Sequence, residues 1–202
     1  MSGSSRTVGA ILAGGTASRY GGTAKGLLEV RPGRTIVEHL IEEMSAAGVA
    51  EVVIVANTPE PYERFGRKVV PDLRPGNGPL GGIETALMHY GDSRDAVLFC
   101  PCDLPGLTRR EISRLLAAYR AKPGGVVVAE TDNFFWHPLC SVVHNDLLPR
   151  VTEALDRGVR SVHELWRQLG AVPVHFDDET PFFNVNTPED LARWRATGGA
   201  GP

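Results

Sequence analysis

The sequence lacks a long apolar run, a strong net charge and an abundance of cysteine. Its apolar runs stay below the roughly 18 residues that a membrane-spanning helix requires, and residues 1–6 lack the apolar stretch of a secretory signal. We therefore expect a cytoplasmic protein with no membrane segment. The net charge of −3 provides no overall basic field, so affinity for nucleic acid is not expected either.

The cysteines are Cys100, Cys102 and Cys140, an odd number that is most simply explained by a reduced chain without disulfides. Cys100 and Cys102 form a single C-x-C with no second pair and no nearby histidine, which is poor evidence for a zinc site. We expect all three thiols to behave as small buried apolar side chains.

Short apolar runs alternate with segments of helical periodicity along the chain, which is typical of an α/β protein. The expected strands cover 8–12, 51–56, 68–70, 96–100, 125–130, 139–143 and 172–176. The expected helices cover 36–47, 80–90, 108–120, 146–156, 161–169 and 188–195, with Thr108 and Thr187 as N-caps. This order predicts a Rossmann-like, mostly parallel sheet with helices on both faces. At 202 residues without repeats, one domain over 7–197 is expected, between flexible ends at 1–6 and 198–202.

A glycine-rich segment, residues 12–25, follows the first expected strand, where parallel α/β sheets place their ligand crevice. Its glycines allow backbone N–H groups to approach a phosphate, and Arg19 and Lys25 add positive charge. Neither G-x-x-x-x-G-K-[ST] nor G-x-G-x-x-G is present. Taken alone, the segment is therefore either a phosphate-binding loop of another type or a merely flexible loop.

Asp103 directly follows the apolar run 97–100, so its carboxylate is expected at the carboxyl end of the sheet, beside the glycine-rich segment. Mg²⁺ is held by one or two carboxylates together with substrate phosphates, which makes Asp103 a candidate metal ligand. The alternative is an aspartate that caps the turn before Pro105. Asn184 and Asn186 flank Val185, so their side chains share one side of an extended segment and suit contacts to a metal, its waters or a phosphate. Alternatively, they form a turn into the helix that Thr187 caps.

These motifs together resemble the molybdenum cofactor guanylyltransferases. The resemblance rests on Leu-Ala-Gly-Gly at 12–15, Ser18-Arg19, Gly21 and Lys25, and on four later segments at 71–72, 78–82, 99–105 and 183–191. It covers nearly the whole chain and implies a fold of the nucleotide-diphospho-sugar transferase type. Ala24 and Tyr20 depart from the family pattern, which usually has Asp before the lysine and commonly Met at the other position.

The resemblance implies that GMP is transferred from GTP to the terminal phosphate of molybdopterin, with release of pyrophosphate and with Mg²⁺ as cofactor. Lys25, Arg19 and Asp103 are then the catalytic residues, with Asn184 and Asn186 linked to the metal. The residues implied to contact GTP are Leu12, Ala13, Gly14, Gly15, Lys25, Asn57, Asp72, Gly81 and Asp103. The GTP-using branch is also indicated by Gly14, because a methyl group there would crowd a purine.

The second half of the chain is implied to bind the pterin, which divides the domain at about 107 into a nucleotide part and a pterin part. His137 lies near the pterin side in the family, although a histidine beside a proline is more often structural. Arg157 and Arg160 meet either the anionic pterin substrate or simply solvent at a helix end. Alternative functions are a cytidylyl or sugar-phosphate transferase on the same fold, or a non-catalytic nucleotide-binding delivery protein. Molybdoenzymes or their chaperones are the candidate partners, and the chain is expected to be a monomer or a weak homo-oligomer.

Overall fold

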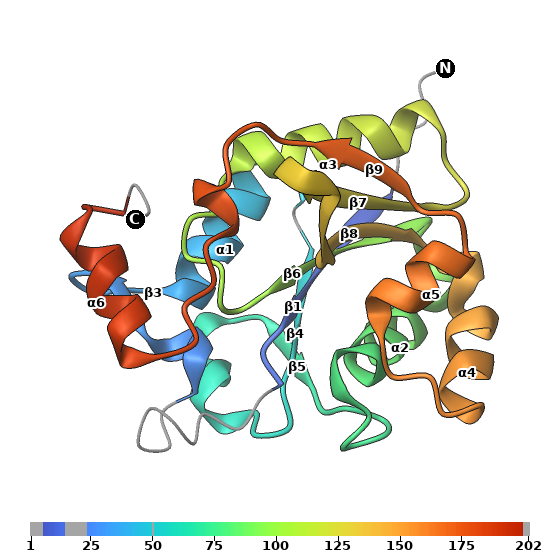
Figure 1. Ribbon diagram of the computed structural model, residues 1–202. Coiled ribbons are helices and arrows are strands. Elements are labelled where there is room, and N and C mark those ends of the chain that lie inside the picture. Colours follow the sequence, from blue (N-terminus) through green and yellow to red (C-terminus); the bar gives the residue numbers. More distant parts are fainter. Residues whose placement is uncertain (1–5, 15–23, 50, 200–202) are drawn as a thin grey trace.

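The computed structural model describes residues 6–14, 24–49 and 51–199, which form a seven-stranded mixed sheet with helices on both faces and a small two-stranded hairpin (Figure 1). Its strand order is β5-β4-β1-β6-β8-β7-β9, and β8 alone runs antiparallel to its neighbours. The strands are β1 (Thr7–Leu12), β4 (Val52–Val55), β5 (Lys68–Val70), β6 (Ala96–Pro101), β7 (Val126–Thr131), β8 (Phe135–His144) and β9 (Val172–His175). The predicted α/β fold with a mostly parallel sheet is confirmed.

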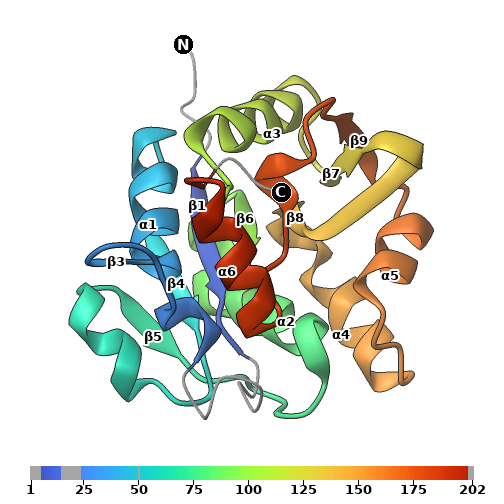
Figure 2. The ribbon, with the colours of Figure 1, turned by 60° about the vertical axis from the view of Figure 1, so that its left-hand side comes forward.

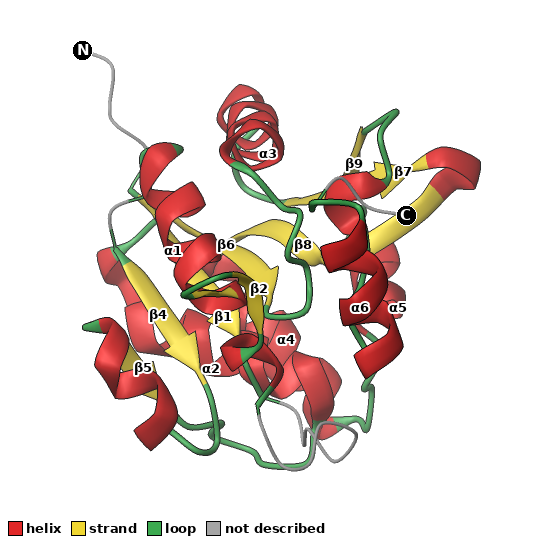
Figure 3. Ribbon diagram, turned by 90° about the vertical axis from the view of Figure 1, so that its left-hand side faces the viewer, coloured by secondary structure: helices red, strands yellow, loops and turns green. Residues whose placement is uncertain are grey.

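Each face of the sheet carries its own hydrophobic core. Helices α1 (Ile36–Ala46), α3 (Arg109–Ala121) and α6 (Pro188–Ala196) cover one face, and α2 (Gly78–Tyr90), α4 (Leu148–Asp156) and α5 (Val162–Gln168) cover the other (Figure 3). Alternate residues of a strand point to opposite faces, so Ile11 joins the first core while Ala10 and Leu12 join the second. A strand apolar on both sides is thus required at the centre of the sheet, and β1 is one.

Polar caps fix where the helices begin. Thr108 and Thr187 each form a capping box with the residue three positions later, as does Thr35 at the start of α1. Pro188 occupies the first position of α6, where a missing N–H costs nothing. The N-caps expected at Thr108 and Thr187 are therefore confirmed.

Short elements that the sequence did not predict fill the connections. They are the hairpin of β2 (Glu29–Arg31) and β3 (Arg34–Thr35), and the 3-10 turns η2 (Lys25–Leu27), η3 (Glu60–Phe65), η4 (Gly91–Ser93), η5 (Asp132–Phe134), η6 (Asn145–Leu147) and η7 (Thr180–Phe182). The C-terminal helix α6 lies against this hairpin, where Arg195 Nε donates to Glu29 O at 3.0 Å (Figure 2). The C-terminal helix is thus held against the hairpin by a hydrogen bond between residues 166 positions apart in the sequence.

Strand β8 is longer than predicted and contains a bulge. Opposite Val128 lies Ser141, but opposite Ala129 lies His137, so residues 138–140 have no partners in the register with β7. Pro138 lacks the N–H that a ladder needs, which explains why the pairing is interrupted here. The predicted strand 139–143 began too late because this proline hides the continuation back to Phe135.

All three cysteines are free thiols buried in the core, as expected for small apolar side chains. Among the described helices, none is both long enough and apolar enough to cross a membrane.

Candidate active site

Two adjoining pockets lie at the carboxyl ends of β1, β4 and β6. The first, here called the loop pocket, is lined by Leu12, Ala13, Gly14, Lys25, Val55, Asp72, Gly78, Pro79, Gly82, Pro101, Cys102, Asp103 and Leu139. The second, here called the aromatic pocket, is lined by Pro79, Pro101, Asp103, Leu104, Phe135, Trp136, His137, Pro138, Leu139, Cys140, Arg160, Ser161, Val162, His163 and Asn184. Asp103 belongs to both pockets and is therefore placed where they meet.

Lys25 lies beside Asp103 and is held there by a long-range contact. Its Nζ donates to Asn186 Oδ1 at 2.7 Å and lies 3.8 Å from Asp103 Oδ2. The next residue must be glycine, because a Cβ at Gly26 would lie 2.6 Å from Val37 Cγ2. Ala24 cannot support the ammonium group as an aspartate would, and Asn186 orients it instead.

Asp103 presents one oxygen, Oδ2, to Lys25. Its Oδ1 is buried and has no hydrogen-bond partner among the described residues. Burial raises the pKa of the Asp103 carboxyl above its ordinary value, and the nearby Lys25 ammonium opposes that rise. A buried carboxylate oxygen without a partner is costly unless a cation or donor completes the site.

The segment 184–186 is joined to Asp103 through the backbone, since Val185 N donates to Asp103 O at 2.9 Å. Asn186 is fixed further by Asp190, whose Oδ2 accepts from Asn186 N at 3.0 Å. Burial alone would raise the pKa of Asp190, but hydrogen bonds from Arg193, Asn186 and Thr187 outweigh it and lower that pKa. The two asparagines diverge in role: Asn186 contacts Lys25, whereas Asn184 is exposed and lines the aromatic pocket.

Asp72 lies on the opposite wall of the loop pocket. Asn57 Nδ2 donates to Asp72 Oδ2 at 3.0 Å, and Asp72 N donates back to Asn57 Oδ1 at 2.9 Å. Asp72 Oδ1 is buried and lacks a hydrogen-bond partner among the described residues. Asn57 is not among the residues that line the pocket; it lies against Asp72 and orients the carboxylate, and its direct contact with a ligand stays a prediction.

Among the other predicted residues, Leu12, Ala13 and Gly14 line the loop pocket, whereas Gly81 does not. Gly81 is buried in α2, where an added Cβ would meet Arg74 O and Asn77 Cβ at 3.3 Å, and Gly82 lines the pocket instead. Successive residues of a helix point roughly 100° apart, so Gly81 and Gly82 face different surroundings. Gly15 and Arg19 lie outside the described residues.

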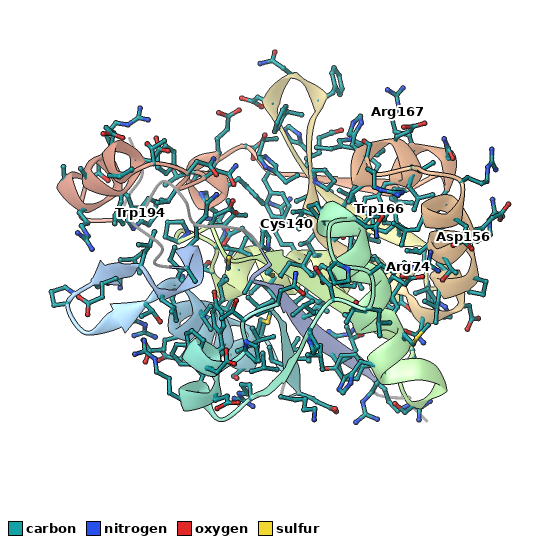
Figure 4. The ribbon with its side chains drawn as sticks, turned by 90° about the horizontal axis from the view of Figure 1, so that it is seen from below. Arg74, Cys140, Asp156, Trp166, Arg167 and Trp194 are labelled. Atoms are coloured by element: carbon teal, nitrogen blue, oxygen red, sulfur yellow. The ribbon has the colours of Figure 1, made fainter. Side chains whose placement is uncertain are left out.

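Arg74 ties the wall that carries Asp72 to the second half of the chain. Its Nε lies 3.0 Å from Glu84 Oε2, and its guanidinium also pairs with Asp156 of α4 (Figure 4). Glu84 is 1% exposed and its Oε1 accepts from Thr152 Oγ1 at 2.8 Å. This network fixes the start of α2, and hence Pro79 and Gly82 of the loop pocket, against α4.

The aromatic pocket is shaped by the bulge of β8. Trp166 Nε1, from α5, donates to Pro138 O at 2.9 Å and anchors the bulge, whose three residues all line the pocket. Bulges next to binding sites re-aim side chains in this way. Trp136 is fixed by a 2.8 Å hydrogen bond from its Nε1 to Glu130 Oε2 and meets the His163 ring edge-on.

His137 contributes a neutral ring to this pocket. It stacks on Phe182 at 4.4 Å between ring centroids, and its Nε2 lies 3.0 Å from Thr131 Oγ1. Burial lowers the pKa of His137 to about 4, so the imidazole is uncharged at neutral pH. Sequence reasoning identified His137 near this side but missed Trp136 and His163; the aromatic run 134–136 followed by His-Pro was the available signal.

The two arginines weighed for an anionic substrate separate clearly. Arg160 lines the aromatic pocket, with its Nη1 bonded to Leu155 O and Val159 O. Arg157 is 75% exposed and lies 3.8 Å from Glu153. Of the two arginines, Arg160 is therefore the one that lies at the aromatic pocket, and Arg157 lies at the solvent-facing end of the helix.

Comparison with known proteins agrees with this arrangement. The model of the MobA-like NTP transferase domain matches residues 9–172, more than half of the chain. The chain belongs to the MobA-like NTP transferase family.

Curated relatives of this MobA-like chain include the "Molybdenum cofactor guanylyltransferase" of Vibrio parahaemolyticus, 34% identical over 185 residues that cover 91% of this chain and 92% of the relative. The protein of the same name from Shewanella sp. (strain MR-4) is 38% identical over 190 residues, covering 92% and 93%. In fold, the chain is similar to the molybdopterin-guanine dinucleotide biosynthesis protein A of Archaeoglobus fulgidus, with a TM-score of 0.76, 23% identity and coverage of 94% and 97%. The predicted family and fold type are thus confirmed, and the chain is a nucleotidyltransferase by family.

Proposed function

We propose that this protein transfers GMP from GTP to the terminal phosphate of molybdopterin, forming molybdopterin guanine dinucleotide and pyrophosphate. The observation that carries the proposal is the position of Asp103 and Lys25 between a polar loop pocket and an aromatic pocket. A donor and an acceptor bound in the two pockets would meet at this pair. Relatives at 34% and 38% identity carry the name of this activity.

The loop pocket suits a nucleoside triphosphate. Gly14 and Gly82 leave room for close approach of the ligand to the backbone, and Lys25 supplies a positive charge for phosphate. Asp72 Oδ1, which has no partner among the described residues, is available to accept from N–H or O–H groups of a guanine base or ribose.

A divalent cation fits the residues at the junction of the pockets. Asp103 Oδ1 is buried without a partner among the described residues, and a carboxylate oxygen is the ligand type that Mg²⁺ prefers. The described residues contain no group of three side chains that could enclose a metal, which agrees with a cation that takes its remaining ligands from substrate phosphates and water. We propose that Asp103 holds Mg²⁺, which when bound would polarise the phosphate oxygens and offset their charge.

The aromatic pocket suits the pterin of the acceptor. Trp136 and neutral His137 offer flat ring surfaces, and Arg160 offers a cation for an anionic group. Asn184 adds a neutral amide that can donate to and accept from heterocycle edges. The charged groups of the loop pocket and the rings of the aromatic pocket support a nucleotide part in the first half of the chain and a pterin part in the second.

The reaction requires no general base from the protein. A phosphate monoester has a second pKa of about 6, so the acceptor phosphate is already an ionised nucleophile near neutral pH. Its oxygen forms a bond to the α-phosphorus of GTP as the bond from that phosphorus to the oxygen bridging the β-phosphate breaks. Pyrophosphate leaves with the bonding electrons, and Lys25 stabilises the charge on the transferring phosphates.

Pyrophosphate release in the presence of molybdopterin tests the proposal, with GTP, CTP and UTP compared with and without Mg²⁺. We expect release to require Mg²⁺ and to be much faster with GTP than with CTP or UTP; rates with CTP equal to those with GTP would favour a cytidylyltransferase. Gly14→Ala sharpens the test because, within the described part of the chain, the added Cβ meets only Asp72 Oδ2, at an ordinary contact distance of 3.7 Å. It should lower the use of GTP more than that of CTP, and equal losses would contradict purine selection at this position.

A further inference from the structure

A third depression, here called the acidic groove, continues from the aromatic pocket. It shares Phe135, His137 and Asn184 with the aromatic pocket, but no residue with the loop pocket among those described. Its remaining lining is Thr131, Asp132, Asn133, Glu179, Thr180, Phe182 and Phe183. The groove thus begins where the acceptor side of the site ends and leads away from the phosphates.

The charge of the groove is negative. Asp132 and Glu179 line it, and no lysine or arginine does within the described part of the chain. Just beyond lies Asp177, which is 98% exposed and 3.4 Å from His175; the same imidazole is 3.6 Å from Asp132. Two guanidiniums lie close to the groove and both are engaged: Arg193 stacks on the Phe183 ring at 5.7 Å and pairs with Asp190, and Arg114 donates to His175 O and covers the Phe176 ring.

The rim of the groove also exposes aromatic rings. Phe134 is 86% exposed and Phe135 is 62% exposed at the turn between β7 and β8. Phe134 adopts a φ of 57°, a left-handed conformation that bulky residues rarely occupy. The two exposed phenylalanine rings offer faces for cation–π contacts, and the carboxylates next to them offer partners for ion pairs.

We propose that the acidic groove docks a basic, arginine- or lysine-containing segment of a partner protein. The groove does not suit either substrate, because both carry phosphates that Asp132 and Glu179 would repel. A cationic segment complements the carboxylates and can stack on Phe134 at the same time. The proposal extends the proposed function, because a partner bound there would sit at the open end of the acceptor pocket, where a pterin product would leave.

Fluorescence anisotropy of the full chain with a labelled nonapeptide of arginine, leucine and serine tests this docking. The matched control peptide carries glutamate in place of each arginine. Asp132→Asn combined with Glu179→Gln removes two charges from the groove, and Phe134→Ser removes the ring. Glu60→Gln combined with Glu63→Gln removes two charges from η3, far along the sheet beside β5, and serves as the control variant.

We expect the arginine peptide to bind, with affinity falling about tenfold in each groove variant and as salt rises, but within twofold of wild type in the control. Equal affinity for all variants, or no binding to wild type, would overturn the proposal. A concentration-dependent dimer that Phe134→Ser abolishes would instead assign the groove to a second copy of the chain. GMP transfer measured on the same preparations keeps the proposals separate, because the groove variants should retain it.

Discussion

The loop pocket and the aromatic pocket are built in opposite ways. The loop pocket is made of residues that directly follow parallel strands, such as Ala13 and Asp103, and its key groups are charged oxygens and an ammonium. The aromatic pocket is made of a bulged antiparallel strand held by Trp166 from a later helix, and its key groups are rings. Residues that follow parallel strands converge at one edge of the sheet, whereas the aromatic pocket depends on a break in the regular ladder that re-aims its side chains.

A substitution of Asp103 should have the largest effect, because this residue lines both pockets. Asp103→Asn keeps the shape but removes the charge, and we expect kcat to fall about 1000-fold with either substrate saturating. Burial raises the pKa of Asp103, so the ionised form costs stability at neutral pH, and the variant should melt no lower than wild type. Steady-state kinetics and calorimetry check both effects; retained activity would remove Asp103 from the reaction.

His137 tests whether the aromatic pocket depends on a neutral ring. Its pKa is about 4 in the folded protein against 6.5 as the ordinary value, so below pH 6.5 the unfolded chain takes up a proton that the folded chain refuses. Stability is therefore lost as pH falls from 6.5 toward 4, by about 2 kcal/mol at pH 5 relative to pH 7.5. Urea unfolding at both pH values should show a loss about 2 kcal/mol larger in wild type than in His137→Gln, because other buried groups such as His39 contribute equally to both proteins. An identical loss in both proteins would refute the assignment.

Trp136 should affect the acceptor alone. Trp136→Leu removes a ring surface held by Glu130, and we expect the KM for molybdopterin to rise about tenfold while the KM for GTP stays unchanged. Trp136→Phe keeps a ring but loses the hydrogen bond, so its KM for molybdopterin should lie between those of wild type and Trp136→Leu. Parallel changes in both KM values would show that the pockets are not separate.

Asn57 should affect the nucleotide alone, and more weakly, because it acts through Asp72. Asn57→Ala leaves Asp72 Oδ2 without its amide donor, and we expect the KM for GTP to rise about fivefold with an unchanged KM for molybdopterin. Isothermal titration with GTP provides an independent measure. Asp72→Ala combined with Asn57→Ala should be no worse than Asp72→Ala, and additive losses would mean that Asn57 contacts the ligand itself.

The same comparison explains how far the sequence could be read. The proximity of Lys25 and Asp103 could be predicted from the sequence, because each belongs to a short motif that follows an apolar strand. The ends of neighbouring parallel strands converge at one edge of the sheet. The sequence could not show that Gly82 lines the loop pocket and Gly81 does not, since periodicity indicates a helix but not its rotation against a pocket. The roles of Asn57 and Asn186 could not be derived, because their partners lie 15 and 161 residues away.

The shape of the aromatic pocket was harder to predict from the sequence than that of the loop pocket. Its shape depends on the bulge at 138–140 and on the hydrogen bond from Trp166 to Pro138, neither of which leaves a periodic signal. Pro138 reads as the end of a strand, although β8 continues through it. Arg157 and Arg160 are both arginines close to the end of α4, and the sequence does not distinguish them. The path of the chain after α4 brings Arg160 to the aromatic pocket and leaves Arg157 in solvent.

The central claim is that the α-phosphorus of GTP and the phosphate of molybdopterin meet at Asp103 and Lys25. The most direct measurement follows the label from [α-³²P]GTP and, in parallel, from [γ-³²P]GTP incubated with the protein, molybdopterin and Mg²⁺. We expect the α label on the pterin product and the γ label in pyrophosphate, with both lost in Asp103→Asn. A γ label on the pterin, or no labelled pterin from wild type, would contradict it.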